Sequence, residues 1–516
     1  STSSKYKRIR FSPLADSRGG LARGYREMIR YPAHDTYKVA RPRTHLAEPL
    51  VQKCGGMQKV ALLSVLSLSI GLASAQNLSF GLRDARPVPE WLHRATIYEV
   101  WLNAFSKEGN LRGAIPGLRH IADLRASIVY LGPIAKRSAN PQASPYSIAD
   151  YNKIDPECGT PQDLHDFVSA AHKLHLKVML DIVYYDMAPD NVMMKNPAFY
   201  VKTSDGKIAR GFWPNPLPNF QNPQVRKYLI DSLVHWVRDF KIDGFRCDVG
   251  GGIPISFWDE ARKALDRVNP QVILLSESDR PDGQLQAFDI NYNFQYYLTL
   301  RSVLRDGAPA IKLRQSWEKM KSTMPREARL LHYDDNHDWP RAILQFGEKG
   351  AMAAQVLDFT LDGIPFIYNG QEVDDPTATH WRSHAPIRWA DHGNPADERA
   401  IKTTLAEYKQ LFEMRARHPA LTSGSVIWIN NTKPDSVLSF LRKKGNSEIL
   451  VILNLSNRDV HVTIDLPVMD YYAVENLLKP GKTWFSLYSG RVSANLGAFD
   501  YVVGKRIPIA PLQTNQ

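Results

Sequence analysis

From Ala95 onward, short apolar segments rich in β-branched residues alternate with longer segments whose apolar residues recur every three or four positions. Short apolar runs predict buried strands, and the longer spacing predicts amphipathic helices. The predicted strands are residues 95–100, 127–134, 177–183, 244–249, 272–278, 287–290, 328–333 and 364–370. The predicted helices include residues 160–175, 222–240, 256–268 and 348–361. This alternation predicts an α/β fold, a (β/α)₈ TIM barrel over residues 95–396.

A doubly wound open sheet is the competing architecture, but no G-x-G-x-x-G follows the first predicted strand. The connection after the third strand, residues 184–221, is long and rich in Pro, Asn and Trp, which predicts a functional loop above the C-terminal rim. Residues 397–420 are predicted to be the last barrel helix. Short strands separated by turns then predict a C-terminal antiparallel β-sandwich over residues 421–516.

The charge is concentrated at one end of the chain. The 516 residues carry a net charge of +12, which by itself favours an acidic partner. Residues 1–75 hold 13 basic and 4 acidic residues, a net charge of +9, whereas residues 76–516 hold 52 basic and 49 acidic residues, a net charge of +3. The predicted folded part is therefore nearly neutral, and nucleic acid is not a predicted partner.

Residues 57–75 resemble a signal peptide, with a lysine, an apolar run from Val60 to Leu72, and Ala-Ser-Ala at the end. The run is too short to span a bilayer, and a buried core helix is the alternative. Cleavage after Ala75 predicts a secreted or periplasmic protein with no membrane segment in its mature form. Residues 1–56 are then an upstream leader or a basic disordered arm, and residues 76–94 an N-terminal linker.

The composition is that of a globular protein, with 43% hydrophobic residues, and excludes collagen-like or disordered chains. Only Cys158 and Cys247 follow the predicted signal peptide, so no framework of disulfides is expected. Cys247 lies in an apolar strand pattern and is predicted to be buried and unpaired.

Charged residues mark the ends of several predicted strands, where barrel enzymes carry their chemistry. These residues are Asp181, Arg246, Asp248, Glu277, His337 and Asp338. Arg246 and Asp248 share one face of a strand, and the guanidinium is expected to lower the pKa of Asp248. The apolar approach to Glu277 is expected to raise its pKa. One ionised and one protonated carboxyl suit retaining glycoside cleavage. The structural alternative is that each aspartate at a strand end, taken alone, is a surface or capping residue.

Three of these segments, GFRCDV (244–249), LLSES (274–278) and DDNHD (334–338), resemble strand-end motifs of glycoside hydrolase family 13, the α-amylase family. Residues 144–160 and 363–372 resemble the family as well, and the resemblance extends from about residue 91 to residue 466. It implies Asp248 as nucleophile, Glu277 as general acid/base and Asp338 as the third acid.

The resemblance also implies substrate-binding residues. Arg246 would orient Asp248, His337 would bond sugar hydroxyls, Tyr146 would stack on the sugar ring, and Asp150 behind it would support the loop. The implied substrate is an α-glucan or maltooligosaccharide.

The third-strand motif departs from the family's Asp-x-Val-x-Asn-His pattern, because Tyr185 and Asp186 stand at its last two positions. The family's Asn often binds a structural Ca²⁺, so the resemblance implies a possible Ca²⁺ site, but Tyr185 stands at that position and no metal-binding residue is assigned. No other cofactor is predicted. The family's His donates to a substrate hydroxyl, whereas Asp186 can only accept while ionised. An altered subsite preference or a lower rate is expected.

Other residues have a structural and a functional interpretation. Four tryptophans, Trp101, Trp213, Trp339 and Trp381, lie in predicted rim loops and either stack on sugar rings or pack internally. His172 and His175 lie on one predicted helix and are interpreted as solvated or packing residues. For four other polar residues a metal site is the weaker alternative to a structural or loop role: Asp190, Asn222, His380 and His384.

Three function classes follow. The first is a secreted, retaining α-glucan hydrolase that cleaves α-1,4 bonds through a covalent glycosyl-enzyme. The second is a transglycosylase or glucan isomerase of the same family, in which a sugar hydroxyl replaces water. The third is a non-catalytic carbohydrate-binding relative, which the intact acids, Arg246 and His337 disfavour. No oligomeric state is predicted.

Overall fold

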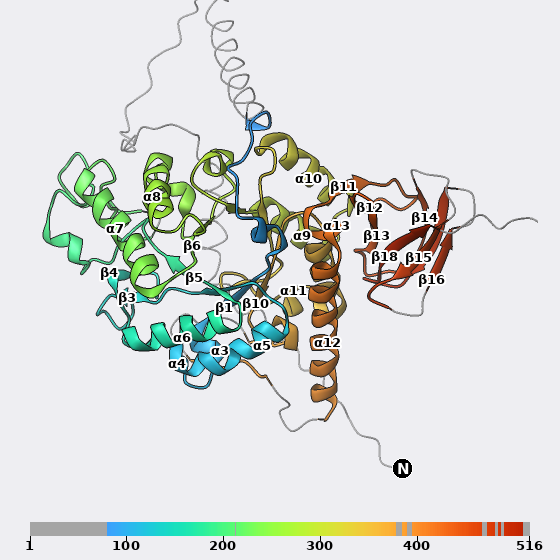
Figure 1. Ribbon diagram of the computed structural model, residues 1–516, viewed down its shortest axis with the longest axis horizontal. Helices are drawn as coiled ribbons and strands as arrows, with labels where there is room; N and C mark the ends of the chain where they lie inside the picture. Colours follow the sequence, from blue (N-terminus) through green and yellow to red (C-terminus); the bar gives the residue numbers. More distant parts are fainter. Residues whose placement is uncertain are drawn as a thin grey trace, which may run out of the picture.

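In the computed structural model, a barrel of strands and helices carries a smaller β-rich module on one side (Figure 1). The structure describes residues 80–211, 213–377, 384–389, 395–466, 472–479, 483–486 and 490–508. The predicted leader and signal peptide, together with His380 and Trp381, lie outside these residues. No helix in the described ranges is both long and apolar enough to cross a membrane.

The eight predicted barrel strands are present, parallel, and closed into a ring in the order β1-β10-β9-β8-β7-β6-β5-β2. They are β1 (Ile97–Val100), β2 (Ile128–Leu131), β5 (Lys177–Ile182), β6 (Gly244–Cys247), β7 (Ile273–Ser276), β8 (Ile290–Tyr292), β9 (Leu330–His332) and β10 (Ile364–Tyr368). Nearly every strand residue is buried, as expected for parallel strands covered on both faces. The closed ring confirms the TIM barrel and excludes the open sheet.

Helices follow the strands because their apolar faces pack on the outside of the barrel. They are α3 (Leu102–Phe105), α4 (Leu111–Ala114), α5 (Leu118–Asp123), α6 (Pro161–Lys173), α7 (Pro223–Phe240), α8 (Ile255–Val268), α9 (Phe294–Leu304), α10 (Ile311–Thr323), α11 (Ala342–Thr360), α12 (Pro395–Arg417) and α13 (Pro419–Ser423). Helix α6 begins with a capping box between Thr160 and Asp163. Helix α7 begins at Pro223 after the N-cap Asn222.

Two predicted boundaries are wrong. The strand expected at residues 287–290 lies instead at Ile290–Tyr292, because the Asp289 carboxylate accepts the backbone N–H of Leu274 at 2.7 Å and pairs with Arg262. Helix α11 begins six residues before the predicted 348–361 segment and is kinked at Gly347, whose φ of 70° is accessible to glycine.

The long connection after β5 folds over the rim as predicted and has more order than its sequence suggests. It contains a short 3₁₀ helix, Val192–Lys195, and three isolated bridges, Tyr200 to Pro218, Lys202 to Ile208 and Arg210 to Pro216. Next to it, the chain between β2 and α6 forms a hairpin of β3 (Ala135–Arg137) and β4 (Ile148–Ile154).

The C-terminal module contains two antiparallel sheets, as predicted. One has the order β11-β12-β13-β18-β15-β16 and the other pairs β14 with β17. The strands are β11 (Ser425–Trp428), β12 (Val437–Lys444), β13 (Ser447–Asn454), β14 (Val460–Asp465), β15 (Tyr472–Asn476), β16 (Thr483–Ser486), β17 (Arg491–Leu496) and β18 (Tyr501–Pro508). Leu450 and Ile452 of the larger sheet pack against Val462, Ile464 and Val492 of the smaller one, which forms a sandwich core.

The opposite face of the larger sheet packs on the barrel helices. Residues at alternate positions, such as Ile449 and Val451, belong to the same buried cluster as Leu411 and Phe412 of α12. Two buried arginines reinforce this contact at the C-terminal end of α11. Arg415 donates to the carbonyl of Phe359 at 3.1 Å, and Arg442 of β12 donates to the carbonyl of Thr360 at 2.6 Å.

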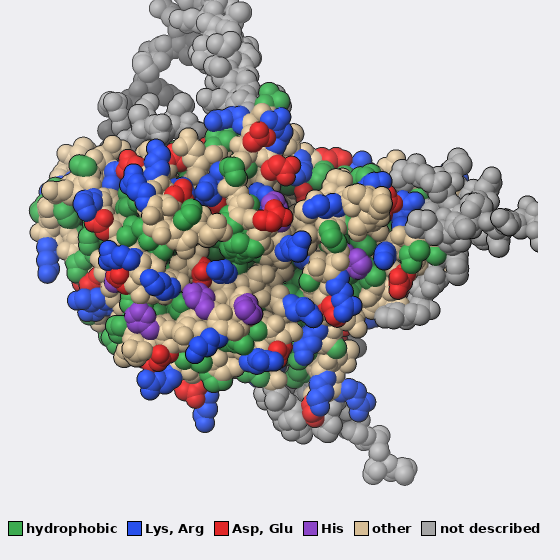
Figure 2. Space-filling view, in the orientation of Figure 1, with side chains coloured by type: hydrophobic (Ala, Val, Ile, Leu, Met, Phe, Trp, Pro, Cys, Tyr) green, Lys and Arg blue, Asp and Glu red, His purple; other side chains and the backbone are tan. Residues whose placement is uncertain are grey.

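On the face of the molecule in Figure 2, Lys and Arg side chains are interspersed with Asp and Glu. Local ion pairs also occur within helices, such as Arg119 with Asp123 and Lys227 with Asp231, each four residues apart. This face therefore has no continuous patch of one sign, in keeping with the small net charge of residues 76–516.

Candidate active site

The centre of the site is the guanidinium of Arg246, which is fully buried at the end of β6. Its Nη1 donates to both carboxylate oxygens of Asp181 at 3.0 Å and to Oδ1 of Asp248 at 2.8 Å. Its Nη2 lies 2.9 Å from Oε1 of Glu277. Three of the predicted acids, from the ends of β5, β6 and β7, therefore meet on one arginine.

Glu277 has a second polar contact that the apolar sequence before it does not reveal. Its Oε2 accepts the backbone N–H of Val249 at 2.7 Å, and Val249 has a φ of 44°. A β-branched residue at a positive φ is rare and strained, and here it directs an N–H at a carboxylate in the site.

The other half of the site comes from the end of β9. His337 contacts Glu99 of β1 through Nδ1, and its Nε2 lies 2.6 Å from the Tyr146 hydroxyl and 3.4 Å from Oδ2 of Asp338. Burial lowers the pKa of His337, but the carboxylates of Asp338 and Glu99 outweigh it and raise the pKa to about 9. The imidazole is thus cationic at neutral pH, and both ring N–H groups donate.

Tyr146 connects the two halves. Its hydroxyl donates to Oδ2 of Asp181 at 2.9 Å and accepts from His337, and its ring lies 5.7 Å from the His337 ring at an interplanar angle of 18°. The structure therefore brings together Arg246, Asp248, Glu277, His337, Asp338 and Tyr146.

Asp150, predicted to support the loop of Tyr146, makes its contacts within the β3–β4 hairpin, whose turn carries Tyr146. It lies on β4, where its carboxylate accepts the backbone N–H of Asn152 at 3.0 Å and pairs with Lys153 at 3.6 Å. Its contacts therefore belong to the β3–β4 hairpin rather than to the Tyr146 side chain.

The predicted lowering of the Asp248 pKa is wrong. Burial raises the pKa of this carboxyl well above its ordinary range, and the charges of Glu277 and Asp181 add to that rise, while Arg246 opposes it. The reason is burial, which disfavours the charged form of the carboxyl more than the Arg246 guanidinium favours it.

A family model described as the α-amylase catalytic domain matches residues 80–204 and 214–419. This chain belongs to the α-amylase family. The match includes every residue of the cluster around Arg246 and confirms the resemblance of its strand-end motifs.

The chain is also similar to individual members of the α-amylase family. It is 24% identical over 454 residues to Alpha-amylase 2 of Dictyoglomus thermophilum, covering 79% of this chain and 74% of that protein. It is 27% identical over 398 residues to a cyclomaltodextrinase of Geobacillus thermopakistaniensis, covering 72% and 66%. A solved maltogenic α-amylase of Thermotoga neapolitana has a TM-score of 0.74 and 26% identity, and the match covers 81% of this chain and 100% of that one. The protein is an α-amylase-family glycoside hydrolase.

The residues at the family's calcium position do not fit the ion in this α-amylase-family chain. The Tyr185 ring packs edge-on to Trp213 at 6.3 Å, and the Asp190 carboxylate accepts the backbone N–H of Ala139 at 2.9 Å. Ca²⁺ needs six to eight oxygen ligands, and the described residues contain no group of three or more His, Cys, Asp or Glu placed to hold a metal. Asn191 instead connects the loop after β5 to β4, because its side-chain amide donates to the carbonyl of Ile148 at 2.8 Å.

The remaining candidates have structural contacts. His172 lies 2.7 Å from Asp243, and Asn222 caps α7. Trp101 is buried and stacks on the inner side of His337 with ring centroids 5.2 Å apart, while Trp339 packs on Tyr297 at 4.7 Å. Trp213 packs against Tyr185, and His384 lies beside Gly109. His175 follows α6 with a positive backbone φ.

The two cysteines in the described part of the chain, Cys158 and Cys247, are free. Cys247 is fully buried, which confirms its predicted state.

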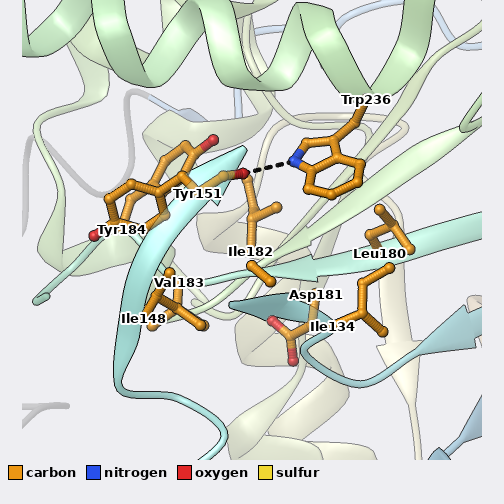
Figure 3. Close-up of a pocket in the computed structure, with 10 residues that line it drawn as sticks. Ile134, Ile148, Tyr151, Leu180, Asp181, Ile182, Val183, Tyr184 and Trp236 are labelled. Carbon is orange, nitrogen blue, oxygen red and sulfur yellow. Dashed lines mark hydrogen bonds between the residues drawn. The ribbon is translucent and has the colours of Figure 1, made fainter. Parts of the chain in front are cut away.

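A small cavity next to the site is lined by Asp181 and mostly by apolar side chains, such as Ile134, Ile148 and Leu180 (Figure 3). Trp236 of α7 closes it and donates through Nε1 to the carbonyl of Tyr151 at 3.0 Å. Its volume of about 10 Å³ is close to that of one water molecule. The space is too small for a sugar.

Asp186 is buried in the rim loop, where its Oδ1 accepts from Asn215 at 3.2 Å. Burial raises the pKa of this carboxyl to about 7, with the Asn215 bond opposing the rise. The expectation that Asp186 can only accept therefore holds only above that pH, because the protonated carboxyl also donates.

Replacing Asp186 by Asn should stabilise the protein at pH 8 and have much less effect at pH 5. The carboxyl binds its proton more tightly in the folded state, so its contribution to stability falls as pH rises from the unfolded value of 3.8 through about 7. We expect the free energy of unfolding to rise by about 2–4 kcal/mol at pH 8, measured by urea unfolding. The control is Asp231→Asn on the exposed face of α7, and an equal effect of Asp186→Asn at both pH values would contradict the prediction.

Proposed function

We propose that this protein is a retaining α-glucan hydrolase that cleaves α-1,4-glucosidic bonds by double displacement. The observation that carries the proposal is the buried contact of one guanidinium with Asp181, Asp248 and Glu277 at the ends of consecutive barrel strands. Retaining cleavage requires two carboxyl groups facing one glycosidic bond, one of them as nucleophile.

The contacts suggest a role for each group. Arg246 holds the Asp248 carboxylate toward the anomeric carbon, where Asp248 attacks and forms a glycosyl-enzyme ester. Glu277, protonated at first, gives its proton to the departing glycosidic oxygen. It then takes a proton from the water that cleaves the ester. Asp338 faces the positive charge that develops on the sugar in both transition states.

His337 and Tyr146 bind the sugar in this proposal. The cationic His337 is held by Glu99 through Nδ1 and lies beside Asp338, and its Nε2–H would donate to a sugar hydroxyl in place of the Tyr146 hydroxyl that accepts it here. The ring of Tyr146 stays half-buried above Asp181 and offers an apolar face for the pyranose ring. A neutral maltooligosaccharide suits these contacts, since they combine ring faces with hydrogen-bonding groups.

We further propose that the protein is exported and that its chain is cut after Ala75. The support is the signal-like sequence of residues 57–75. N-terminal sequencing of protein recovered from the medium or periplasm should begin at Gln76, and a protein that keeps residues 57–75 would contradict export by this route.

The test of the hydrolase is product release from maltotriose, with the anomer followed by proton NMR. The wild type should release the α-anomer first, because two inversions retain configuration. Glu277→Gln should lower kcat by about 10²–10⁴-fold, the usual contribution of a general acid. Glu260→Gln, on the exposed face of α8, is the control. A wild type that releases no sugar, or an unchanged rate in Glu277→Gln, would refute the proposal.

A further inference from the structure

A carboxylate stands inside the barrel on its first strand. Glu99 lies on β1 and, like Ile97, faces the barrel interior, whereas Tyr98 between them faces the surrounding helices. Interior positions of such barrels are usually filled by bulky apolar side chains. The Glu99 side chain is fully buried, and burying a charge is costly unless a partner compensates for it. Packing alone therefore does not explain this residue.

The Glu99 carboxylate contacts one side chain, that of His337. Its Oε1 accepts the Nδ1–H of His337, while its Oε2 is buried and makes no hydrogen bond within the described part of the chain. A carboxylate that tied several elements together would use both oxygens, because a buried acceptor left unpaired is unfavourable. Whatever Glu99 contributes therefore passes through the imidazole of His337.

The other groups around His337 show what that contribution is. The titratable groups that face its ring come from four elements: Glu99 on β1, Tyr146 from the β3–β4 hairpin, Arg246 on β6, and Asp338 next to it in the chain. Burial and Arg246 disfavour the cationic imidazole, whereas Asp338 and Glu99 favour it. Without Glu99, Asp338 alone among these groups would balance the cation.

We propose that Glu99 is a positioning residue that balances the charge of His337 from inside the barrel, directs the opposite ring N–H into the site, and leaves the Asp338 carboxylate to face the sugar. The inference rests on the proposed function, which places a sugar hydroxyl at Nε2 of His337 and the developing positive charge at Asp338. Glu99 itself does not touch the substrate, and its effect on the reaction is exerted through a residue 238 positions away.

The test compares the pH dependence of kcat/KM in the wild type and in Glu99→Gln, with 4-nitrophenyl α-maltoside as substrate. Nitrophenol departs without a proton from Glu277, so the alkaline limb reports His337 rather than the general acid. The wild type should lose activity with a midpoint at a pH of about 9. Gln has the size of Glu and still accepts from Nδ1, but it carries no charge. The midpoint should therefore fall, with the proton bound at least tenfold less tightly.

Two comparisons separate this role from a structural one. Glu372→Gln is the matched control, because Glu372 is also a buried carboxyl in contact with a histidine, 2.8 Å from Nε2 of His120, but on the outer side of β1. It should leave the midpoint at about 9. In a His337→Gln background, Glu99→Gln should change kcat/KM no further, whereas the effect of a structural role would add to that of His337→Gln.

The titration of the His337 ring is a second measurement, which needs neither substrate nor a change at Glu99. In protein carrying isotope-labelled histidine, the NMR signal of His337 is the one that His337→Gln removes. In the wild type it should titrate at about 9, and titration near the ordinary value of 6.5 would overturn the inference. So would an unchanged midpoint in Glu99→Gln, or an effect of Glu99→Gln that persists in the His337→Gln background. A wild type that releases no sugar refutes the proposed function instead, and the ring titration distinguishes the two failures.

Discussion

Asp248→Asn is expected to lower kcat for maltotriose by about 10⁵–10⁶-fold, the scale on which a hydrolase loses activity when its nucleophile is removed. The amide has nearly the same shape and can still accept from Arg246, which lies 2.8 Å away. It cannot form the glycosyl ester. Because burial raises the pKa of Asp248, removing its charge should leave the free energy of unfolding unchanged or higher.

A substrate with an activated leaving group distinguishes the role of the nucleophile, Asp248, from that of the general acid, Glu277. With 4-nitrophenyl α-maltoside, the leaving group needs no proton, so Glu277→Gln should release a rapid burst of nitrophenol while Asp248→Asn releases none. Asp239→Asn, on the exposed surface of α7, controls for a general effect of Asp→Asn substitution. A burst from Asp248→Asn would show that another group attacks the sugar.

Arg246→Met is expected to lower both activity and stability. The substitution leaves Asp181, Asp248 and Glu277 buried without their shared cation, and losing one partner of a buried pair costs about 3–5 kcal/mol. The loss should be larger at pH 8 than at pH 5, because protonation of the carboxyls removes their repulsion at the lower pH. Urea unfolding at the two pH values measures it.

Two further variants test whether the loss comes from removing the charge of Arg246 or its planar guanidinium. Arg246→Lys keeps the charge without the planar fork, so it should recover part of the stability and little of the activity. Arg238→Met, an exposed arginine on α7, should change neither. Equal stability of Arg246→Met and the wild type would show that the three acids do not depend on this guanidinium.

Local patterns in the sequence are sufficient to predict the barrel. Each strand is a short apolar run that can be recognised alone, and the spacing of Arg246 and Asp248 already placed both on one face. The weakest run, at residues 287–290, was displaced because Asp289 forms contacts with Arg262 and Leu274 from other elements.

The parts of the site that the sequence did not reveal depend on long-range contacts. Glu99 is 238 residues from His337, and the only local signal for it was a charged residue inside the buried run ATIYEV. The pKa of Asp248 depends on the assembled fold as well, since both the burial that raises it and the smaller effects of Glu277 and Asp181 arise only when the strands meet.

The central strands of the larger sheet, β12 and β13, are covered on both faces, because one face packs on the smaller sheet and the other on the barrel helices. Arg415 and Arg442 would lose their carbonyl partners if the two parts separated. The barrel and the C-terminal module are therefore expected to fold as one unit, although the catalytic domain ends between them in the sequence. The barrel and the module should melt in a single cooperative transition, and a chain that ends before Ser425 would expose an apolar surface that favours aggregation.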